Sequence, residues 1–251
     1  MRHLPQGMLL GPLLACALLL LALPALATVP VGGSKNFTES VVLATLARAA
    51  GRQHGVQVQL RPALGGTRIV WRALREGDID AYPEYTGTLT HELLPNTAPD
   101  ASIAALRKRL HTLGIGMTDP LGFNNTYALG MRETEAKRLH IARISDLRAQ
   151  PQLKLAFSNE FMNRVDGWPG LKRAYRLPMH ARGMSHDVAY RALASGAIDV
   201  TDLYRTDAEI AYTTCACSRT IYTISHVTMR FICIGWICAN GRPSSSPRCK
   251  A

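Results

Sequence analysis

Two segments of the chain carry nearly the same sequence: WRALREGDID at residues 71–80 and YRALASGAID at residues 190–199. In each copy a helical pattern ends at a glycine and a short strand follows, and Tyr85 and Tyr204 come five residues after the final aspartates. Ligands of open α/β sheets bind at the carboxyl ends of strands. The repeat therefore predicts two similar lobes, each presenting an aromatic side chain to a shared cleft. Chance similarity between common helix-to-strand sequences is the alternative.

Helix and strand patterns alternate through the sequence around this repeat. Thr38 is expected to cap a helix that Gly51 or Gly55 ends, because a hydroxyl there precedes apolar residues at helical spacing. Further helices are expected at 68–75, 101–113 and 187–195, and strands at 56–60, 79–82, 127–131, 153–157 and 198–200. Such alternation predicts an α/β fold with largely parallel sheets.

The net charge of +11 is unevenly distributed. Residues 213–251 hold five basic residues and no acidic one, whereas residues 28–212 hold 23 basic and 18 acidic residues, a net charge of only +5. The body of the protein is thus mildly basic, and the composition gives no support for a nucleic-acid partner.

The frequency of cysteine changes at the same place in the sequence as the charge. Five of the six follow residue 212, one is Cys16, and residues 28–212 have none. We interpret residues 209–251 as an aberrant, Cys-rich basic tail, produced by a frameshift near Thr213. A genuine small Cys-rich module is the alternative, and a zinc site built from Cys215, Cys217, Cys233 and Cys238 lacks the usual pair of CxxC knuckles.

Residues 1–27 have the layout of a secretory signal peptide. Arg2 precedes an apolar run from Met8 to Leu23, Pro24 interrupts it, and Ala25-Leu26-Ala27 provides the small residues of a cleavage site. A lipoprotein anchor at Cys16 is the alternative, although the residues after it stay apolar. Either reading places the body outside the cytoplasm, in the periplasm, where a Cys-free chain suits the oxidising conditions.

Several motifs occur in order over residues 30–210 that resemble the glycine betaine/choline-binding proteins of osmoprotectant (quaternary amine) ABC importers. They are GSKNFTE at 33–39, GGT at 65–67, GDIDAYPEYTGT at 77–88, FNNTYAL at 123–129, FMNRVDG at 161–167 and DLYRTD at 202–207. The resemblance implies a two-lobed, type II periplasmic-binding-protein fold, with lobe 1 at 28–120 and lobe 2 at 121–208. Members of that family continue with a segment that returns to the first lobe, so lobe 1 is expected to be incomplete here.

The resemblance also implies the ligand site and the partners. A quaternary ammonium has no N–H group, so aromatic faces must hold it. The cage positions of the family match Tyr85, Tyr127 and Tyr204, and its carboxylate-binding positions match Lys35, Thr88 and Arg164. Thr88 stands where choline-restricted relatives have an acid, which leaves betaines acceptable. The implied partners are a small quaternary ammonium ligand and an ABC transporter permease, with no cofactor.

Two other classes of function remain as alternatives. A secreted hydrolase could be imagined from Ser158, Asp187 and His186, but the chain has no G-x-S-x-G sequence. The eight histidines show neither HExxH nor HxxxH spacing, so no metal site is expected. The remaining alternative is a non-functional or partly folded product of a frameshifted gene.

Overall fold

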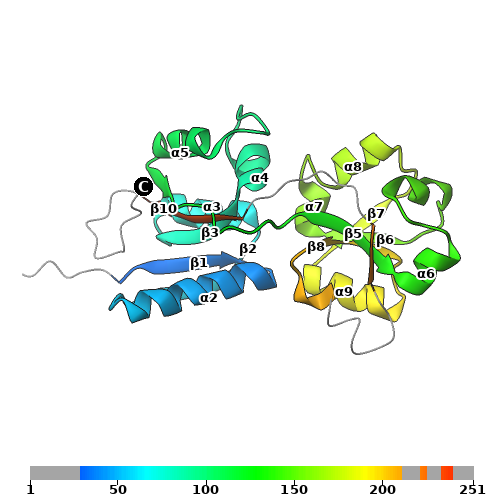
Figure 1. Cartoon of the computed structure of the whole chain (residues 1–251), viewed down its shortest axis with the longest axis horizontal. Coiled ribbons are helices and arrows are strands. Elements are labelled where there is room, and N and C mark those ends of the chain that lie inside the picture. The colour runs from blue at the N-terminus through cyan, green and yellow to red at the C-terminus, as the bar shows by residue number, and fades with distance from the viewer. Residues whose placement is uncertain (1–28, 211–220, 225–232, 240–251) are drawn as a thin grey trace, which may run out of the picture.

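The structure, a computed structural model, describes residues 29–210, 221–224 and 233–239. The predicted signal peptide and most of the predicted tail lie outside these ranges. Two five-stranded sheets, each covered by helices, form two lobes that lie next to one another along the long axis of the molecule (Figure 1). Two lobes, as the internal repeat predicts, are therefore present.

Lobe 1 contains the sheet of strand order β2-β1-β3-β10-β4. Its elements are β1 (Val31–Lys35), α2 (Thr38–Gln53), β2 (Gln59–Gly65), α3 (Thr67–Glu76), β3 (Ala81–Tyr85), α4 (Thr86–Thr88), the π-helical turn η1 (Leu89–Leu93), α5 (Ile103–His111), β4 (Ile115–Met117) and β10 (Cys233–Ala239). Val70 and Leu74 on α3, and Leu106 and Leu110 on α5, are each one turn apart and fully buried in its core.

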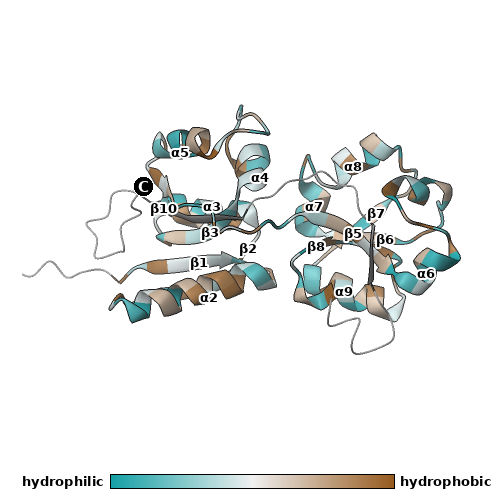
Figure 2. Ribbon diagram, viewed as in Figure 1, coloured by the Kyte–Doolittle hydropathy of each residue, from teal (hydrophilic) through white to brown (hydrophobic). Residues whose placement is uncertain are grey.

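Lobe 2 contains the sheet of strand order β7-β6-β8-β5-β9. Its elements are β5 (Tyr127–Arg132), α6 (Glu133–Arg138), the 3₁₀ turn η2 (Ile144–Ala149), β6 (Leu155–Ser158), α7 (Asn159–Asn163), α8 (Trp168–Tyr175), β7 (Ala181–Met184), α9 (His186–Ser195), β8 (Val200–Tyr204) and β9 (Ile221–Ile224). The strongly hydrophilic colour of Figure 2 gathers on helices such as α6, and the sheets between the helices are paler or brown.

The two copies of the internal repeat fold alike. Helices α3 and α9 end at Gly77 and Gly196, which have φ of 79° and 82°, in the left-handed region that a glycine enters without steric cost. The strands that follow, β3 and β8, end at Tyr85 and Tyr204. The predicted order of helix, glycine, strand and tyrosine is confirmed in each lobe, but the strands begin two residues later than expected and include the tyrosines as their last residues.

The sheets are mixed, which corrects the expectation of largely parallel sheets. Strands β1, β2 and β3 pair in parallel in lobe 1, as do β6, β7 and β8 in lobe 2. By contrast, β10 runs antiparallel to β3 and β4, and β5 runs antiparallel to β8 and β9. The reason is topological: β5 and β10 each follow a strand of the other lobe, so they enter their sheets from the opposite end.

Strand β10 also corrects the expectation that lobe 1 lacks its returning strand. Cys233–Ala239, from the predicted tail, lies between β3 and β4 in the lobe 1 sheet. Residues Ile221–Ile224 of the tail add a strand to the edge of the lobe 2 sheet. The tail therefore contributes to both sheets.

Two local predictions were wrong near the start of lobe 1. Helix α2 begins at Thr38 with Phe37 as its N-cap residue, whereas Thr38 was expected to be the cap. The strand expected at 56–60 lies at Gln59–Gly65 instead. The amide of Val56 donates to the carbonyl of Gly51, so the residues after α2 close the helix end before the strand can begin.

Among the described residues, no helix has the length and apolar character needed to cross a bilayer. Within the same ranges, no three His, Cys, Asp or Glu side chains gather as a metal site would require.

Candidate functional site

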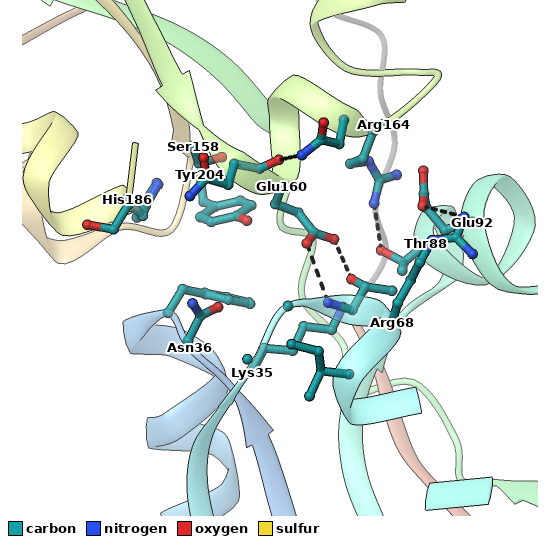
Figure 3. A pocket seen from close by; sticks show the side chains of 18 of the residues that line it. Lys35, Asn36, Arg68, Thr88, Glu92, Ser158, Glu160, Arg164, His186 and Tyr204 are labelled. Atoms are coloured by element: carbon teal, nitrogen blue, oxygen red, sulfur yellow. Dashed lines mark hydrogen bonds and ion pairs between the residues drawn. The ribbon is translucent and has the colours of Figure 1, made fainter. Parts of the chain in front are cut away.

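A cavity of about 460 Å³ lies between the two lobes. Its walls are made of residues at the strand ends and helix starts of both sheets, and all six predicted site residues line it: Lys35, Tyr85, Thr88, Tyr127, Arg164 and Tyr204. Figure 3 shows side chains from the two lobes facing one another across it. The structure therefore brings together residues that are up to 169 positions apart in the sequence.

Strand polarity explains why these residues meet. Lys35, Tyr85 and Tyr204 are the last residues of β1, β3 and β8, so they lie at carboxyl ends of their sheets. Tyr127 is the first residue of β5, but β5 runs antiparallel to β8 and pairs Tyr127 directly with Tyr204. Because β5 is antiparallel to β8, its first residue lies at the same edge of the sheet as the last residue of β8.

The three tyrosines belong to one continuous row of aromatic rings. The ring centroids of Tyr127 and Tyr204 are 4.8 Å apart, and their hydroxyl oxygens are 3.1 Å apart. Phe37 lies 4.8 Å from Tyr204 and 6.0 Å from Tyr85, measured between centroids. Burial raises the pKa of both Tyr127 and Tyr204, so these phenols stay neutral and keep their mutual hydrogen bond.

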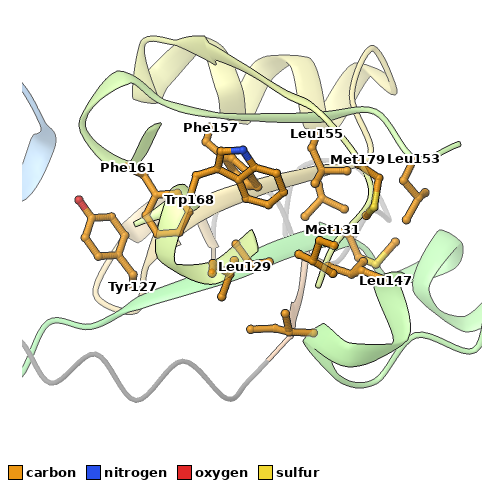
Figure 4. Packing of buried hydrophobic residues seen from close by; sticks show 14 of the residues in the cluster. Tyr127, Leu129, Met131, Leu147, Leu153, Leu155, Phe157, Phe161, Trp168 and Met179 are labelled. Atoms are coloured by element: carbon orange, nitrogen blue, oxygen red, sulfur yellow. The ribbon is translucent and has the colours of Figure 1, made fainter. Parts of the chain in front are cut away.

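The core of lobe 2 supports Tyr127 from behind. Its ring centroid is 5.0 Å from that of Phe161, and Phe161 and Trp168 both pack on Phe157 (Figure 4). These three side chains are at most 6% exposed. A tightly packed base of this kind fixes the orientation of the ring that faces the cavity.

Two buried cations line the cavity, and each pairs with a carboxylate. The ammonium of Lys35 lies 2.5 Å from Glu84, and 5.3 Å from the ring centroid of Tyr85. The guanidinium of Arg164 donates two bonds to Asp166, at 2.9 and 2.7 Å, and another to the hydroxyl of Thr88 at 3.1 Å. Burial by itself would lower the pKa of Arg164, but nearby acidic groups and the bonds to Asp166 outweigh it, so the pKa is raised and Arg164 stays charged.

Glu160 joins the lobes and was missed from the sequence. Its carboxylate, on α7 of lobe 2, accepts hydrogen bonds from the backbone amide and the hydroxyl of Thr67 on α3 of lobe 1. A Cβ added to Gly66 would lie 2.9 Å from Oε2 of Glu160, so a side chain there would push the end of the Glu160 side chain away from its present position. Nothing in the spacing of these residues pointed to this contact between the lobes.

Glu39 makes a second link at the cavity. Its Oε1 accepts hydrogen bonds from the hydroxyl of Tyr85 at 2.6 Å and from the amide group of Asn125 at 2.8 Å. Glu39 is on α2, and Asn125 lies just before β5, where the chain has crossed from one sheet to the other. The hydroxyl edge of Tyr85 is therefore held by a carboxylate, which fixes the orientation of its ring at the cavity.

Ser158 and His186, which the hydrolase alternative would use for catalysis, have separate structural roles. The hydroxyl of Ser158 donates to Asp202 at 2.6 Å and accepts from the amide of Phe161, which caps α7. Nε2 of His186 lies 2.9 Å from Asp207, which also accepts bonds from the hydroxyl of Tyr190 and the amide of Tyr204. Ser158 and His186 thus use different carboxylates, and His186 helps to position Tyr204.

A family model described as the substrate binding domain of ABC-type glycine betaine transport systems matches residues 28–214. The ergothioneine transport permease/ergothioneine binding protein EgtU of Helicobacter pylori (strain G27) is 31% identical over 207 residues, which are 79% of this chain and 37% of that protein. The glycine betaine-binding protein YehZ of Escherichia coli (strain K12) is 32% identical over 181 residues, 66% of this chain and 57% of that protein. The chain thus spans less than two thirds of the length of either relative.

A solved structure of a glycine betaine/carnitine/choline ABC transporter protein has the same fold, with a TM-score of 0.62. The two are 24% identical, over 84% of this chain and 79% of that one. The family consists of transporter substrate-binding proteins rather than enzymes. With three quarters of its residues matched by the family model, this chain belongs to the family of substrate-binding domains of ABC-type glycine betaine transport systems.

Proposed function

We propose that this protein is the extracytoplasmic binding component of an ABC importer and captures a small quaternary ammonium solute between its lobes. One observation carries the proposal: Tyr85, Tyr127 and Tyr204 line a single cavity between the two sheets, together with Lys35, Thr88 and Arg164. The names of the relatives, which refer to glycine betaine and ergothioneine, agree with that class of ligand.

The aromatic side of the cavity suits a methylated ammonium group. Such a group has no N–H to donate, but the negative faces of aromatic rings attract it, by about 0.5–2 kcal/mol per ring. Three rings thus supply up to several kcal/mol. Cations that are strongly hydrated gain less because they must first lose their water.

The basic side of the cavity suits a carboxylate. Arg164 is 2% exposed, stays charged, and is held in place by Asp166 and Thr88. Lys35 lies near the face of Tyr85, and its charge is shared with Glu84. Thr88 adds a hydroxyl without negative charge. This combination would accept the carboxylate of a betaine, with Arg164 as the main cation.

The mechanism is closure of the lobes over the ligand. Hydrogen bonds already join the lobes from Thr67 to Glu160 and from Arg164 to Thr88. A ligand that contacts both lobes favours the closed form, in proportion to the difference between its affinities for the closed and open forms. A permease that recognises the closed form would then receive only loaded protein. The predicted signal peptide at 1–27 would export the chain to the compartment where this happens.

The test is a ligand titration of purified protein without its first 27 residues. Isothermal calorimetry and tryptophan fluorescence would follow glycine betaine, choline, carnitine and ergothioneine, with sodium acetate and ammonium chloride as controls for charge alone. We expect saturable binding of at least one methylated ammonium compound and none of the controls. If a sample that is folded by circular dichroism binds none of the four compounds, the proposal is wrong.

A further inference from the structure

Phe37 is an apolar side chain where a polar one is usual. It is the N-cap residue of α2, with extended backbone at φ −127° and ψ 154°, and N-cap positions favour residues with a side-chain oxygen. Its neighbours Asn36 and Thr38 are exposed, whereas Phe37 is 8% exposed and lines the cavity. Of the three residues 36–38, only Phe37 therefore turns its side chain inward. As a result, no side chain caps the N-terminus of α2.

The surroundings of Phe37 are not the core of its own lobe. Val70, Leu74 and Leu106 belong to the core cluster of lobe 1, and Phe37 does not. Phe37 and Tyr85 group instead with the buried residues of lobe 2. A phenylalanine that only filled space in lobe 1 would contact the former cluster.

The rings beside Phe37 come from both lobes. Its centroid is 6.0 Å from that of Tyr85, in lobe 1, and 4.8 Å from that of Tyr204, in lobe 2. The ring planes are inclined by 38° and 32°, so both contacts are tilted. Phe37 is therefore the ring that connects the tyrosine of one lobe with the tyrosine pair of the other.

We propose that Phe37 is a fourth aromatic wall of the ligand cavity and determines the preference of the protein for a quaternary ammonium cation over an uncharged group of the same shape. This inference rests on the function proposed above. A phenyl ring attracts a cation through its face, as a tyrosine does, but has no hydroxyl that must find a partner in the dry space between the lobes. Phe37 lies in the part of the cavity that Tyr85 and Tyr204 share, where the methylated nitrogen would contact all three rings.

The experiment compares choline with 3,3-dimethylbutan-1-ol, in which a carbon atom replaces the nitrogen. Dissociation constants for both would be measured by calorimetry, directly or in competition, for the wild-type protein and for Phe37→Leu. Leucine keeps an apolar side chain and removes the ring. We expect Phe37→Leu to weaken choline binding about 2- to 30-fold, and to change binding of the neutral alcohol much less.

Two further variants control for folding and for aromatic content. Phe37→Trp keeps an aromatic face and is expected to retain the preference for choline. Phe123→Leu replaces a half-buried phenylalanine that packs on the lobe 2 cluster but does not line the cavity, and is expected to leave both affinities unchanged. Melting curves of all variants confirm that they are folded.

The possible outcomes separate the inference from the proposed function. If Phe37→Leu weakens both ligands equally, Phe37 contributes packing alone and the inference is wrong. If the variant binds choline more tightly, Phe37 obstructs the cavity, which also overturns it. If the wild-type protein binds no quaternary ammonium compound, the proposed function fails and the inference falls with it.

Discussion

His186 and Asp207 form a buried pair next to the ring of Tyr204. Burial lowers the pKa of His186, but the hydrogen bond and negative charge of Asp207 outweigh it, and the net effect is a raised pKa. The charges of Asp202 and Glu209 also raise the pKa of His186. The two aromatic rings that pack against the imidazole, those of Tyr190 and Tyr204, are uncharged. The folded protein therefore favours the imidazolium form.

This pair predicts a loss of stability with increasing pH. Because the folded-state pKa lies above that of the unfolded chain, the contribution is complete below the unfolded pKa of about 6.5 and disappears as the pH rises through the folded value. His186→Asn should lower the free energy of unfolding by about 1.5–3 kcal/mol at pH 5.5, and by less at pH 9. Urea unfolding at the two pH values measures this. An equal loss at both would contradict the assignment.

Tyr204 allows the ring to be separated from its hydroxyl. Tyr204→Phe loses only the hydrogen bond to Tyr127, whereas Tyr204→Ala loses the aromatic face. We expect Tyr204→Ala to weaken quaternary ammonium binding by about 2- to 30-fold. The affinity of Tyr204→Phe should stay close to that of the wild-type protein. Calorimetry measures both. A larger effect of Tyr204→Phe would show that the hydroxyl, and not the face, binds the ligand.

At the scale of the element, α3 of lobe 1 depends on α7 of lobe 2 for its cap. The N-cap residue of α3 is Gly66, which has no side chain to offer, and Glu160 binds the backbone amide of Thr67 instead. A carboxylate at the positive end of a helix is favourable. Because this carboxylate comes from the other lobe, its contribution is present only when the lobes are close together.

Glu160→Gln should therefore open the lobes without unfolding either one. The amide keeps the shape of the side chain and removes its charge, so we expect a larger radius of gyration in solution scattering and ligand binding weaker by about 10-fold or more. Glu133→Gln is the matched control, because Glu133 lies in the first turn of α6 and pairs within that helix with Lys137. An unchanged radius and affinity for Glu160→Gln would refute the role of this contact in closure.

At the scale of the whole molecule, two segments of the tail, Ile221–Ile224 and Cys233–Ala239, belong to the two sheets. Strand β10 lies between β3 and β4, and β9 pairs with β5. A chain that stops at Ile210 would leave unpaired strand edges in both lobes, which favours aggregation. We expect the melting temperature of this truncated protein to fall by about 10 °C or more, with aggregates in gel filtration. A truncated monomer as stable as the full chain would show that the tail contributes nothing.

The origin of the tail is a separate prediction. Its cysteines and its lack of acidic residues still indicate a change of reading frame near Thr213. Reading the coding DNA past codon 212 in the other two frames tests this, and we expect one of them to encode an acid-containing, Cys-free continuation. If no such frame exists, the tail is native, and its strands belong to the fold as it evolved.

Local signals in the sequence determined much of this protein. Helical and strand periodicity, the stops at Gly77 and Gly196, and the tyrosines at equivalent distances after them predicted two similar lobes. The ordered motifs predicted the family and six residues that line one cavity. These features are readable because each depends on residues only a few positions apart.

Only the tertiary structure decided the contacts between distant segments. The antiparallel entry of β5 and β10 depends on the path of the chain between the lobes, which no local pattern encodes. The bond from Thr67 to Glu160 spans 93 positions, and Phe37 meets Tyr204 across 167. Sequence periodicity shows which side of an element is buried, but the partner of that side is set by how the two lobes pack.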